Sequence, residues 1–227
     1  MTDRVRWAER ELAYEFSNPR LLDQALTHRS ASSENNERLE FLGDAMLGLI
    51  VAKALYELRP EANEGDLSRA RAALVKKGTL AEIGRQIGVD KQLTLGTGEL
   101  RTGGAQRSSA LADAVEAVIG AVVLDGGYQA GELLVRRLIA EPLDALPPSD
   151  ELKDAKTRLQ EWLQARGHGL PEYNVDDVSG SDHNQYFAVS CRIDADERVS
   201  IGQGSSRRGA EQAAAEAMLI ELQSGDQ

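Results

Sequence analysis

Five acidic side chains on two separate segments have the types and spacing of a site for a divalent cation. If residues 36–45, NERLEFLGDA, form a helix, then Glu37, Glu40 and Asp44 lie within about 60° of one another, because successive helical residues are about 100° apart. Asp113 and Glu116, three residues apart, share a helix face in the same way. Mg²⁺ prefers such carboxylate oxygens, and a cation bound there could support phosphodiester hydrolysis.

Apolar and small residues indicate how the two segments would pack. The residues expected to face away from the carboxylates are Leu39, Leu42, Met46 and Leu49, and, in the second segment, Leu111, Val115, Val118 and Val122. The small residues that would let the helices approach closely are Ala114, Ala117, Gly120 and Ala121. Phe41 and Val51 flank the acidic stripe and no basic residue lies within it, which is unusual for a solvated face. Spacing alone still leaves a metal site and a solvated acidic face open.

The elements that would position these residues are predicted to be mostly helices. Asn18-Pro19 is a typical helix start, and further helices are expected at 35–58, 64–77, 79–87, 109–124 and 127–139. The segment 94–109 is rich in Gly and Thr and is expected to be an exposed loop. Pro147-Pro148 lies in a polar stretch typical of a linker. We therefore expect a mainly α domain at 1–142, a linker at 143–152 and a second domain at 153–224.

The second domain is predicted to be a small α+β unit. A helix is expected at 154–166, with Ala155, Leu159 and Trp162 on one stripe. In QYFAVSCRI, alternate residues from Phe187 to Ile193 are apolar, as in a half-buried strand, and Cys191 would be a core residue. EYNV and RVSI are expected to be its neighbours in the sheet. A helix at 206–222, expected to bury Ala210, Ala213, Ala214 and Ala217, completes the order α-β-β-β-α.

Polar residues on the two predicted helices of this domain suit an RNA backbone. At the start of the last helix, free backbone N–H groups would combine with four side chains to bind phosphate: Ser205, Ser206, Arg207 and Arg208. Thr157, Gln160 and Gln164 share one face of the first helix, and such uncharged hydrogen-bonding groups suit a minor groove of 2′-hydroxyls. His183, in the loop between the first two strands, could reach the next groove. Taken alone, the last helix start could also be an ordinary capped helix with surface arginines.

With THRS at 27–30 and LADAVEAVIGAVVLD at 111–125, the segment NERLEFLGDA resembles the signature of the ribonuclease III family. The resemblance implies an RNase III-type endonuclease domain that acts as a homodimer on double-stranded RNA and requires Mg²⁺, for which Mn²⁺ would substitute. By this resemblance the metal ligands would be Glu40, Asp113 and Glu116, the catalytic residues Asp44 and Glu116, and the accessory acidic pair at the subunit interface Glu37 and Glu64. Products would carry 5′-phosphate and 3′-hydroxyl ends with two-nucleotide 3′ overhangs. Substrates would be ribosomal RNA precursors and other structured transcripts, and Phe41 and Val51 would be dimer contacts.

The C-terminal pattern is similar to the double-stranded-RNA-binding domain, on KTRLQEWLQ, GLPEY, HNQYF and GQGSSRRGAEQAAAEA. The family often has a third basic residue after the Arg pair, but this chain has Gly209, which costs roughly 1 kcal/mol of helix propensity relative to Ala. From Glu151 onward, 8 Lys and Arg face 14 Asp and Glu, a net charge of −6. We therefore expect the isolated C-terminal domain to bind RNA weakly and with a strong dependence on salt.

Composition and charge limit the other classes of protein. The net charge of −11 over 227 residues requires that any RNA-binding cations be concentrated on one face. One cysteine permits no intrachain disulfide, and neither a signal-peptide core nor an apolar membrane span is evident, so a cytoplasmic protein is expected. A Ser/His/Asp hydrolase would need a nucleophile elbow, and a di-iron site would need Glu-x-x-His pairs. The sequence has neither pattern, so both classes of enzyme are disfavoured. The alternatives to the nuclease are a non-catalytic duplex-RNA-binding protein, which would lack some of the acidic ligands, and a helical scaffold, which would lack the Thr/Gln stripe and paired arginines.

Overall fold

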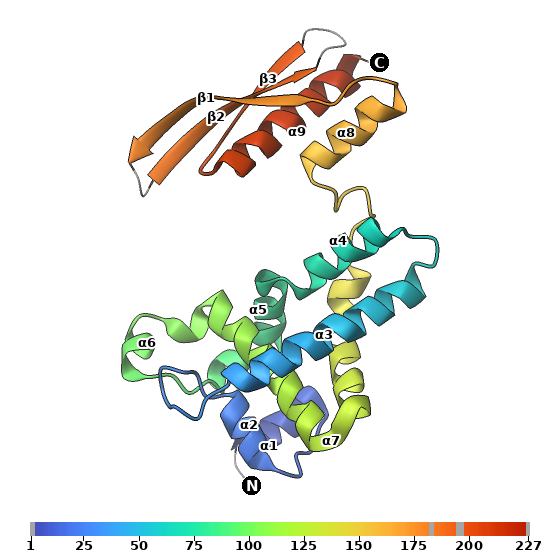
Figure 1. Cartoon of the computed structure of the whole chain (residues 1–227). Helices are drawn as coiled ribbons and strands as arrows, with labels where there is room; N and C mark the ends of the chain where they lie inside the picture. Colours follow the sequence, from blue (N-terminus) through green and yellow to red (C-terminus); the bar gives the residue numbers. More distant parts are fainter. Residues whose placement is uncertain (1–2, 182–183, 194–197, 226–227) are drawn as a thin grey trace. The chain divides into compact units, whose positions relative to one another are not determined.

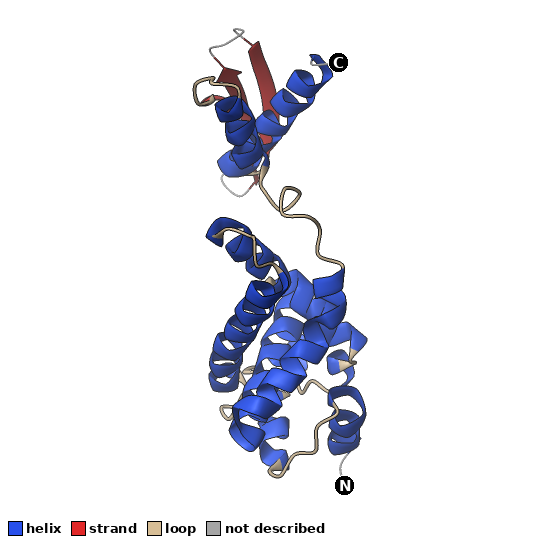
Figure 2. Ribbon diagram, turned by 90° about the vertical axis from the view of Figure 1, so that its right-hand side faces the viewer, coloured by secondary structure: helices blue, strands red, loops and turns tan. Residues whose placement is uncertain are grey.

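The computed structural model describes residues 3–181, 184–193 and 198–225. The chain divides into two compact units, Met1–Pro147 and Pro148–Gln227. The first is built from helices and the second contains the sheet (Figures 1 and 2).

The N-terminal unit is helical, as predicted. Its elements are α1 (Asp3–Trp7), the π-helical turn η1 (Ala8–Leu12), α2 (Pro19–Ala25), α3 (Glu37–Leu58), α4 (Glu64–Val75), α5 (Lys77–Gln86), η2 (Val89–Lys91), α6 (Thr97–Arg101), η3 (Gly104–Gln106) and α7 (Ser108–Asp144). The long helices α3 and α7 pack against each other, and α5 packs against α7 (Figure 1). The centre of the unit is formed by fully buried aliphatic side chains, among them Leu47, Ile50, Leu111 and Ile119. Burying each of these side chains stabilises the fold by about 1.5–3 kcal/mol.

Two predicted segments need correction, the loop at 94–109 and the start of the linker at 143. The expected loop at 94–109 contains α6 and η3, because local contacts organise it: the Arg107 guanidinium lies 3.0 Å from Glu99 and donates to the Thr102 hydroxyl at 3.0 Å. The two helices expected at 109–124 and 127–139 are confirmed, because α7 consists of two helices that meet at a kink at Gly127, whose backbone is not helical (φ +79°, ψ −175°). The helix runs on to Asp144, two residues into the expected linker, and its end is capped by the Ala145 N–H.

A single carboxylate joins the N-terminal segment to α7. Asp125 accepts hydrogen bonds from the Tyr14 hydroxyl and from the backbone N–H groups of Ser17 and Asn18, each at 2.8 Å. Burial alone would raise the pKa of Asp125, but these three hydrogen bonds outweigh it and lower the pKa. A Cβ on the neighbouring Gly126 would lie 2.4 Å from the Tyr14 hydroxyl and would have to displace it, so the glycine leaves room for this contact.

The C-terminal unit has the predicted order α-β-β-β-α. It consists of α8 (Ala155–Ala165), β1 (Glu172–Ser181), β2 (Asn184–Ile193), β3 (Arg198–Gly204) and α9 (Arg207–Gly225). The antiparallel sheet has the order β1-β2-β3. Leu159 and Leu163 of α8 form one core with Cys191 of β2 and Met218 of α9, so both helices cover the same face of the sheet. Cys191 is buried, as expected.

The buried face of α9 is rotated from the predicted one. Ala210 and Ala214 are buried as expected, but Ala213 is exposed and Ala217 only half-buried. Gly202 on β3 explains the difference, because a Cβ at this position would lie 2.0 Å from the Ala214 backbone nitrogen. The helix backbone therefore sits directly on the strand, with Ala210, Ala214 and Met218 turned inward.

Candidate metal centre

The helices α3 and α7 approach closely because each has a glycine at their contact. A Cβ on Gly43 would lie 1.7 Å from the carbonyl oxygen of Glu116, and a Cβ on Gly120 would lie 2.2 Å from that of Leu39. Real Cβ atoms essentially never approach this closely, so no side chain fits at either position. This approach brings the acidic faces of the two helices together.

Three of the predicted acids converge at this contact. Glu40, Asp113 and Glu116 each offer a carboxylate oxygen, and these oxygens lie within 4.8 Å of one another. We call these three residues the acidic cluster. Mg²⁺ coordinates oxygen at about 2.1 Å, so two ligands of one ion are at most about 4.2 Å apart, and small side-chain rotations would bring the cluster into that range. The donor set therefore fits a hydrated divalent cation.

Burial, together with mutual repulsion, raises the pKa of two carboxylates of the cluster. Burial, followed by the charges of Asp44, Glu40 and Asp113, raises the pKa of Glu116 to about 7. Burial and then the charge of Asp113 also raise the pKa of Glu40. Such shifts arise where carboxylates share one site, and a cation bound between them would relieve the repulsion.

Asp44 and Glu37 lie beside the cluster without belonging to it. After burial, the Asp44 charge makes the largest contribution to the raised pKa of Glu116, and the Glu37 charge contributes to that of Glu40. Both side chains are exposed on α3. Of the five acidic residues that the sequence indicated, four therefore lie together at the contact of α3 and α7, and Glu37 lies at the edge of this group.

A lysine at the start of α5 also faces the cluster, although the sequence patterns did not indicate it. The Lys77 ammonium lies 3.7 Å from an Asp113 carboxylate oxygen, and its charge acts to lower the pKa of Glu40 and Glu116. Lys77 was missed because helical periodicity relates residues within one helix, whereas this contact joins α5 to α7.

Two residues of the cluster, Glu40 and Asp113, line a polar hollow of about 600 Å³, which we call the N-terminal hollow. It is lined by both acids and cations, including Glu37, Glu40, Asp113, Arg29, Lys77 and Arg107. His28 lies in its wall, where its Nδ1 accepts from the Ser30 N–H at 3.1 Å and lies 2.8 Å from the Ser30 hydroxyl. The Ser30 hydroxyl in turn accepts from the Gly96 N–H at 2.9 Å. His28 therefore braces a loop. The mixture of cations and carboxylates suits a phosphodiester that approaches a bound cation.

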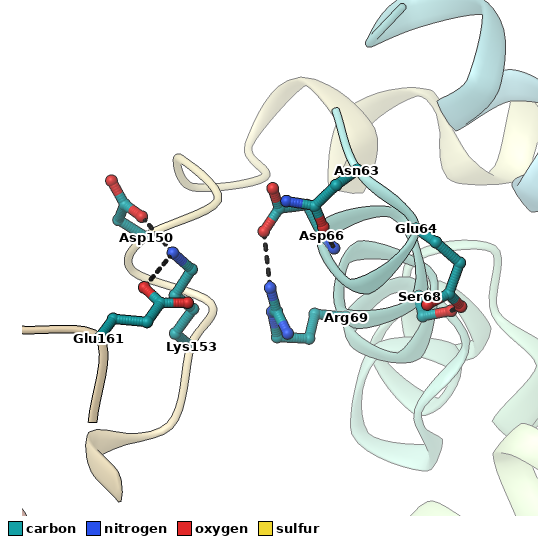
Figure 3. A network of polar contacts seen from close by, with 8 residues as sticks. All are labelled: Asn63, Glu64, Asp66, Ser68, Arg69, Asp150, Lys153 and Glu161. Atoms are coloured by element: carbon teal, nitrogen blue, oxygen red, sulfur yellow. Dashed lines mark hydrogen bonds and ion pairs between the residues drawn. The ribbon is translucent and has the colours of Figure 1, made fainter. Parts of the chain in front are cut away.

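The remaining predicted residues of this unit lie elsewhere. Glu64 is at the start of α4, where it accepts a hydrogen bond from Ser68 at 2.7 Å (Figure 3), and it does not line the N-terminal hollow. Its pairing with Glu37 across subunits stays a prediction. Val51 is fully buried, so its expected role as a surface contact is wrong, whereas Phe41 is 81% exposed. Leu49, expected in the core, is also largely exposed.

The C-terminal unit has a second hollow, of about 610 Å³, between the starts of α8 and α9. This C-terminal hollow is lined by Asp154, Lys156, Thr157, Gln160, Arg207, Arg208, Glu211 and Gln212. It brings together four of the residues predicted to bind RNA, whereas Gln164, Ser205 and Ser206 do not line it. The Ser206 hydroxyl accepts from the Gly209 N–H at 3.1 Å and so caps α9. His183 lies outside the described residues.

Comparisons with known proteins agree with both units. Residues 18–143 match the family described as "Ribonuclease-III-like", and residues 155–222 match the "Double-stranded RNA binding motif". The chain is 50% identical over 225 residues to the "Ribonuclease 3" of Vibrio vulnificus strain YJ016, covering 99% of this chain and 100% of the relative. It is 52% identical over 212 residues to that of Alkalilimnicola ehrlichii, covering 93% of each.

A solved structure matches the N-terminal unit. The nuclease domain of ribonuclease III from Campylobacter jejuni is 40% identical, with a TM-score of 0.60 over 62% of this chain and 97% of that domain. No helix in the described part of the chain is both long and apolar enough to cross a membrane.

Proposed function

The chain belongs to the ribonuclease III family of double-stranded-RNA endonucleases, and we propose that it hydrolyses duplex RNA with Mg²⁺ held by Glu40, Asp113 and Glu116. The observation that carries this proposal is the convergence of these three carboxylates from two helices whose contact tolerates no side chain. Mn²⁺ would substitute, since it accepts the same oxygen ligands.

Each acidic residue has a proposed role in the reaction. A divalent cation bound to the cluster would supply Lewis acidity, which activates water and stabilises negative charge on the phosphoryl oxygens. Asp44, exposed beside Glu116, would orient the attacking water, and Glu116 would combine binding of the cation with catalysis. Placing these carboxylates on two packed helices fixes their positions before the substrate arrives.

Dimerisation is the second part of the proposal. Phe41 and Leu49 are large apolar side chains exposed on α3, and Leu124 is exposed on α7. Phe41 and Leu124 line one surface hollow together, and a two-fold interface would pair this surface with the same surface of a second copy. One active centre per subunit, each cutting one strand, would leave 5′-phosphate and 3′-hydroxyl ends with two-nucleotide 3′ overhangs.

The C-terminal hollow would recognise the shape of the RNA duplex. Thr157 and Gln160 offer hydrogen bonds suited to 2′-hydroxyls, and Arg207 and Arg208 offer charge for phosphates. Such contacts distinguish duplex from single-stranded RNA without reading its base sequence. The expected substrates are ribosomal RNA precursors and other structured transcripts in the cytoplasm.

A cleavage assay with an isosteric variant tests the proposal. Purified chain is incubated with long duplex RNA in Mg²⁺ or in chelator, beside the variant Asp44→Asn. We expect cleavage only by the unaltered chain with Mg²⁺, and retained RNA binding by the variant in Ca²⁺. Single-stranded RNA should resist. Cleavage that persists in chelator would exclude the metal mechanism, and equal cleavage by Asp44→Asn would exclude the role of that carboxylate.

A further inference from the structure

Acidic side chains occupy the same C-terminal hollow as the cations expected to bind RNA. Three cations line it, Lys156, Arg207 and Arg208, together with the carboxylates of Asp154 and Glu211. Asp154 has a structural reason to be there, because its side chain accepts the Thr157 N–H at 2.9 Å and caps α8. Glu211 caps no helix, since it lies one turn into α9.

Glu211 pairs with two of the three cations. One of its carboxylate oxygens accepts from the Lys156 ammonium at 2.6 Å and the other from Arg207 Nε at 2.9 Å. Only 13% of its side chain is exposed. The Lys156 hydrogen bond lowers the pKa of Glu211 against the effect of burial, and Arg207 lowers it further, so Glu211 stays charged at neutral pH.

Lys156 is held from two sides. Its ammonium lies on the Glu211 carboxylate and also 4.2 Å from the centre of the Tyr173 ring, in a cation–π contact. Two-thirds of its side chain is covered. In this position Lys156 is directed into the protein, and a phosphate that entered the hollow would compete with Glu211 for it.

From these contacts we propose that Glu211 sets the RNA affinity of this chain by competing with backbone phosphates for Lys156 and Arg207. The inference rests on the proposed function, because it requires that duplex RNA binds in the C-terminal hollow. It gives a structural reason for the weak RNA binding that the acidic composition of this unit predicts, despite its paired arginines at a helix start. Glu211 is a residue that tunes affinity through its neighbours and need not touch RNA itself.

The substitution Glu211→Gln tests the inference in the full chain. It keeps the shape of the side chain and one acceptor oxygen but removes the negative charge. A matched control is Glu216→Gln, which makes the same charge change on the same helix. Glu216 pairs with Arg158 at 3.3 Å and does not line the hollow. Both variants are compared with the unaltered chain by binding to a short duplex RNA in Ca²⁺ without Mg²⁺, over a range of salt concentrations.

We expect Glu211→Gln to bind more tightly at low salt by about threefold to tenfold, the effect of one charge a few ångström from a phosphate in water. Its affinity should also fall more steeply with salt, by about one unit of the log–log slope for each added phosphate contact. Glu216→Gln should change the affinity less than twofold. A purely structural role for Glu211 would lower the melting temperature without steepening the slope.

Two results would overturn the inference in distinguishable ways. If the unaltered chain binds RNA but Glu211→Gln binds equally or less tightly, or if Glu216→Gln tightens binding as much, then Glu211 does not set the affinity and the proposed function stands. If the unaltered chain binds no duplex RNA even at low salt, both the inference and the proposed RNA recognition fail.

Discussion

The carbonyl oxygen of Glu116 lies where the side chain of Gly43 would begin, with only 1.7 Å to an added Cβ. The helix that carries Glu40 can therefore lie directly against the helix that carries Asp113 and Glu116. A glycine three residues after one candidate ligand thus determines whether the acidic cluster forms.

The first prediction concerns this glycine. Gly43→Ala should destabilise the fold by about 1–3 kcal/mol or more, because the new methyl group meets rigid backbone, and it should weaken binding of Mn²⁺ by forcing α3 and α7 apart. Gly48→Ala is the control on the same helix, since nothing lies within 4 Å of its Cβ. It should stabilise the chain by about 0.5–1 kcal/mol through helix propensity. Urea unfolding and Mn²⁺ titration measure both effects, and equal behaviour of the two variants would refute the role given to Gly43.

The second prediction concerns Lys77, whose ammonium is 3.7 Å from Asp113. Lys77→Gln should bind Mn²⁺ more tightly, by about threefold, because a cation that competes for the carboxylates is removed. The titration is done at pH 8, above the pKa of about 7 that burial and the Asp44 charge give Glu116. Lys76→Gln makes the same charge change on the adjacent residue and should have a smaller effect. Weaker binding by Lys77→Gln would show that the lysine supports the site instead.

The third prediction concerns the stability contributed by Asp125. Three hydrogen bonds lower its pKa in the folded state below the ordinary value of 3.8, despite burial. Its contribution is therefore fully present above pH 3.8 and is lost as the pH falls below this value. Asp125→Asn should reduce the free energy of unfolding by about 1–3 kcal/mol at pH 7, since donors lose a charged acceptor. The difference in the free energy of unfolding between Asp125→Asn and the unaltered chain should become smaller at pH 3, as measured by urea unfolding at both pH values.

A second variant measures how much of this stability comes from the Tyr14 hydroxyl alone. Tyr14→Phe removes one of the three donors and keeps the edge-to-face contact with Phe16, whose ring centre is 4.9 Å away. At pH 7, Tyr14→Phe should reduce the free energy of unfolding by less than Asp125→Asn does, because two of the three hydrogen bonds remain. The pKa shift assigned to Asp125 would be contradicted if the unaltered chain and Asp125→Asn differed in their free energy of unfolding by the same amount at pH 3 and at pH 7.

The fourth prediction concerns the surface around Phe41. Phe41→Glu should shift the chain from dimer to monomer, because a charge placed in an apolar interface must be desolvated. Leu170→Glu is the control, as it changes another exposed apolar residue in the C-terminal unit. Light scattering coupled to size exclusion measures the mass. A dimer that survives Phe41→Glu would place the interface elsewhere.

Sequence periodicity predicted those features that depend on one helix or strand at a time. Glu40 and Asp44 on one helix, and Asp113 and Glu116 on another, follow from the angle between successive residues. Periodicity did not predict Lys77, which reaches the cluster from a third helix. The burial of Val51 was also missed, because the packing of neighbouring helices decides which side of α3 is covered.

A glycine accounts for another difference between prediction and structure. The rotation of α9 depends on Gly202 of β3, the strand that precedes the helix in the chain, because the helix backbone lies directly on this glycine. In α6, local ion pairs and hydrogen bonds outweigh a composition typical of a loop. The effect of such glycines depends on what approaches them, which a single sequence does not state.

The most direct test of the central claim locates the cation itself. Crystals of the chain grown with Mn²⁺ are measured at the manganese absorption edge, and an anomalous difference map is calculated. We expect a peak within coordination distance of Glu40, Asp113 and Glu116, which disappears in the Glu116→Gln variant. A peak bound by other carboxylates, or none between α3 and α7 at saturating Mn²⁺, would contradict the proposal that this acidic cluster is the metal centre.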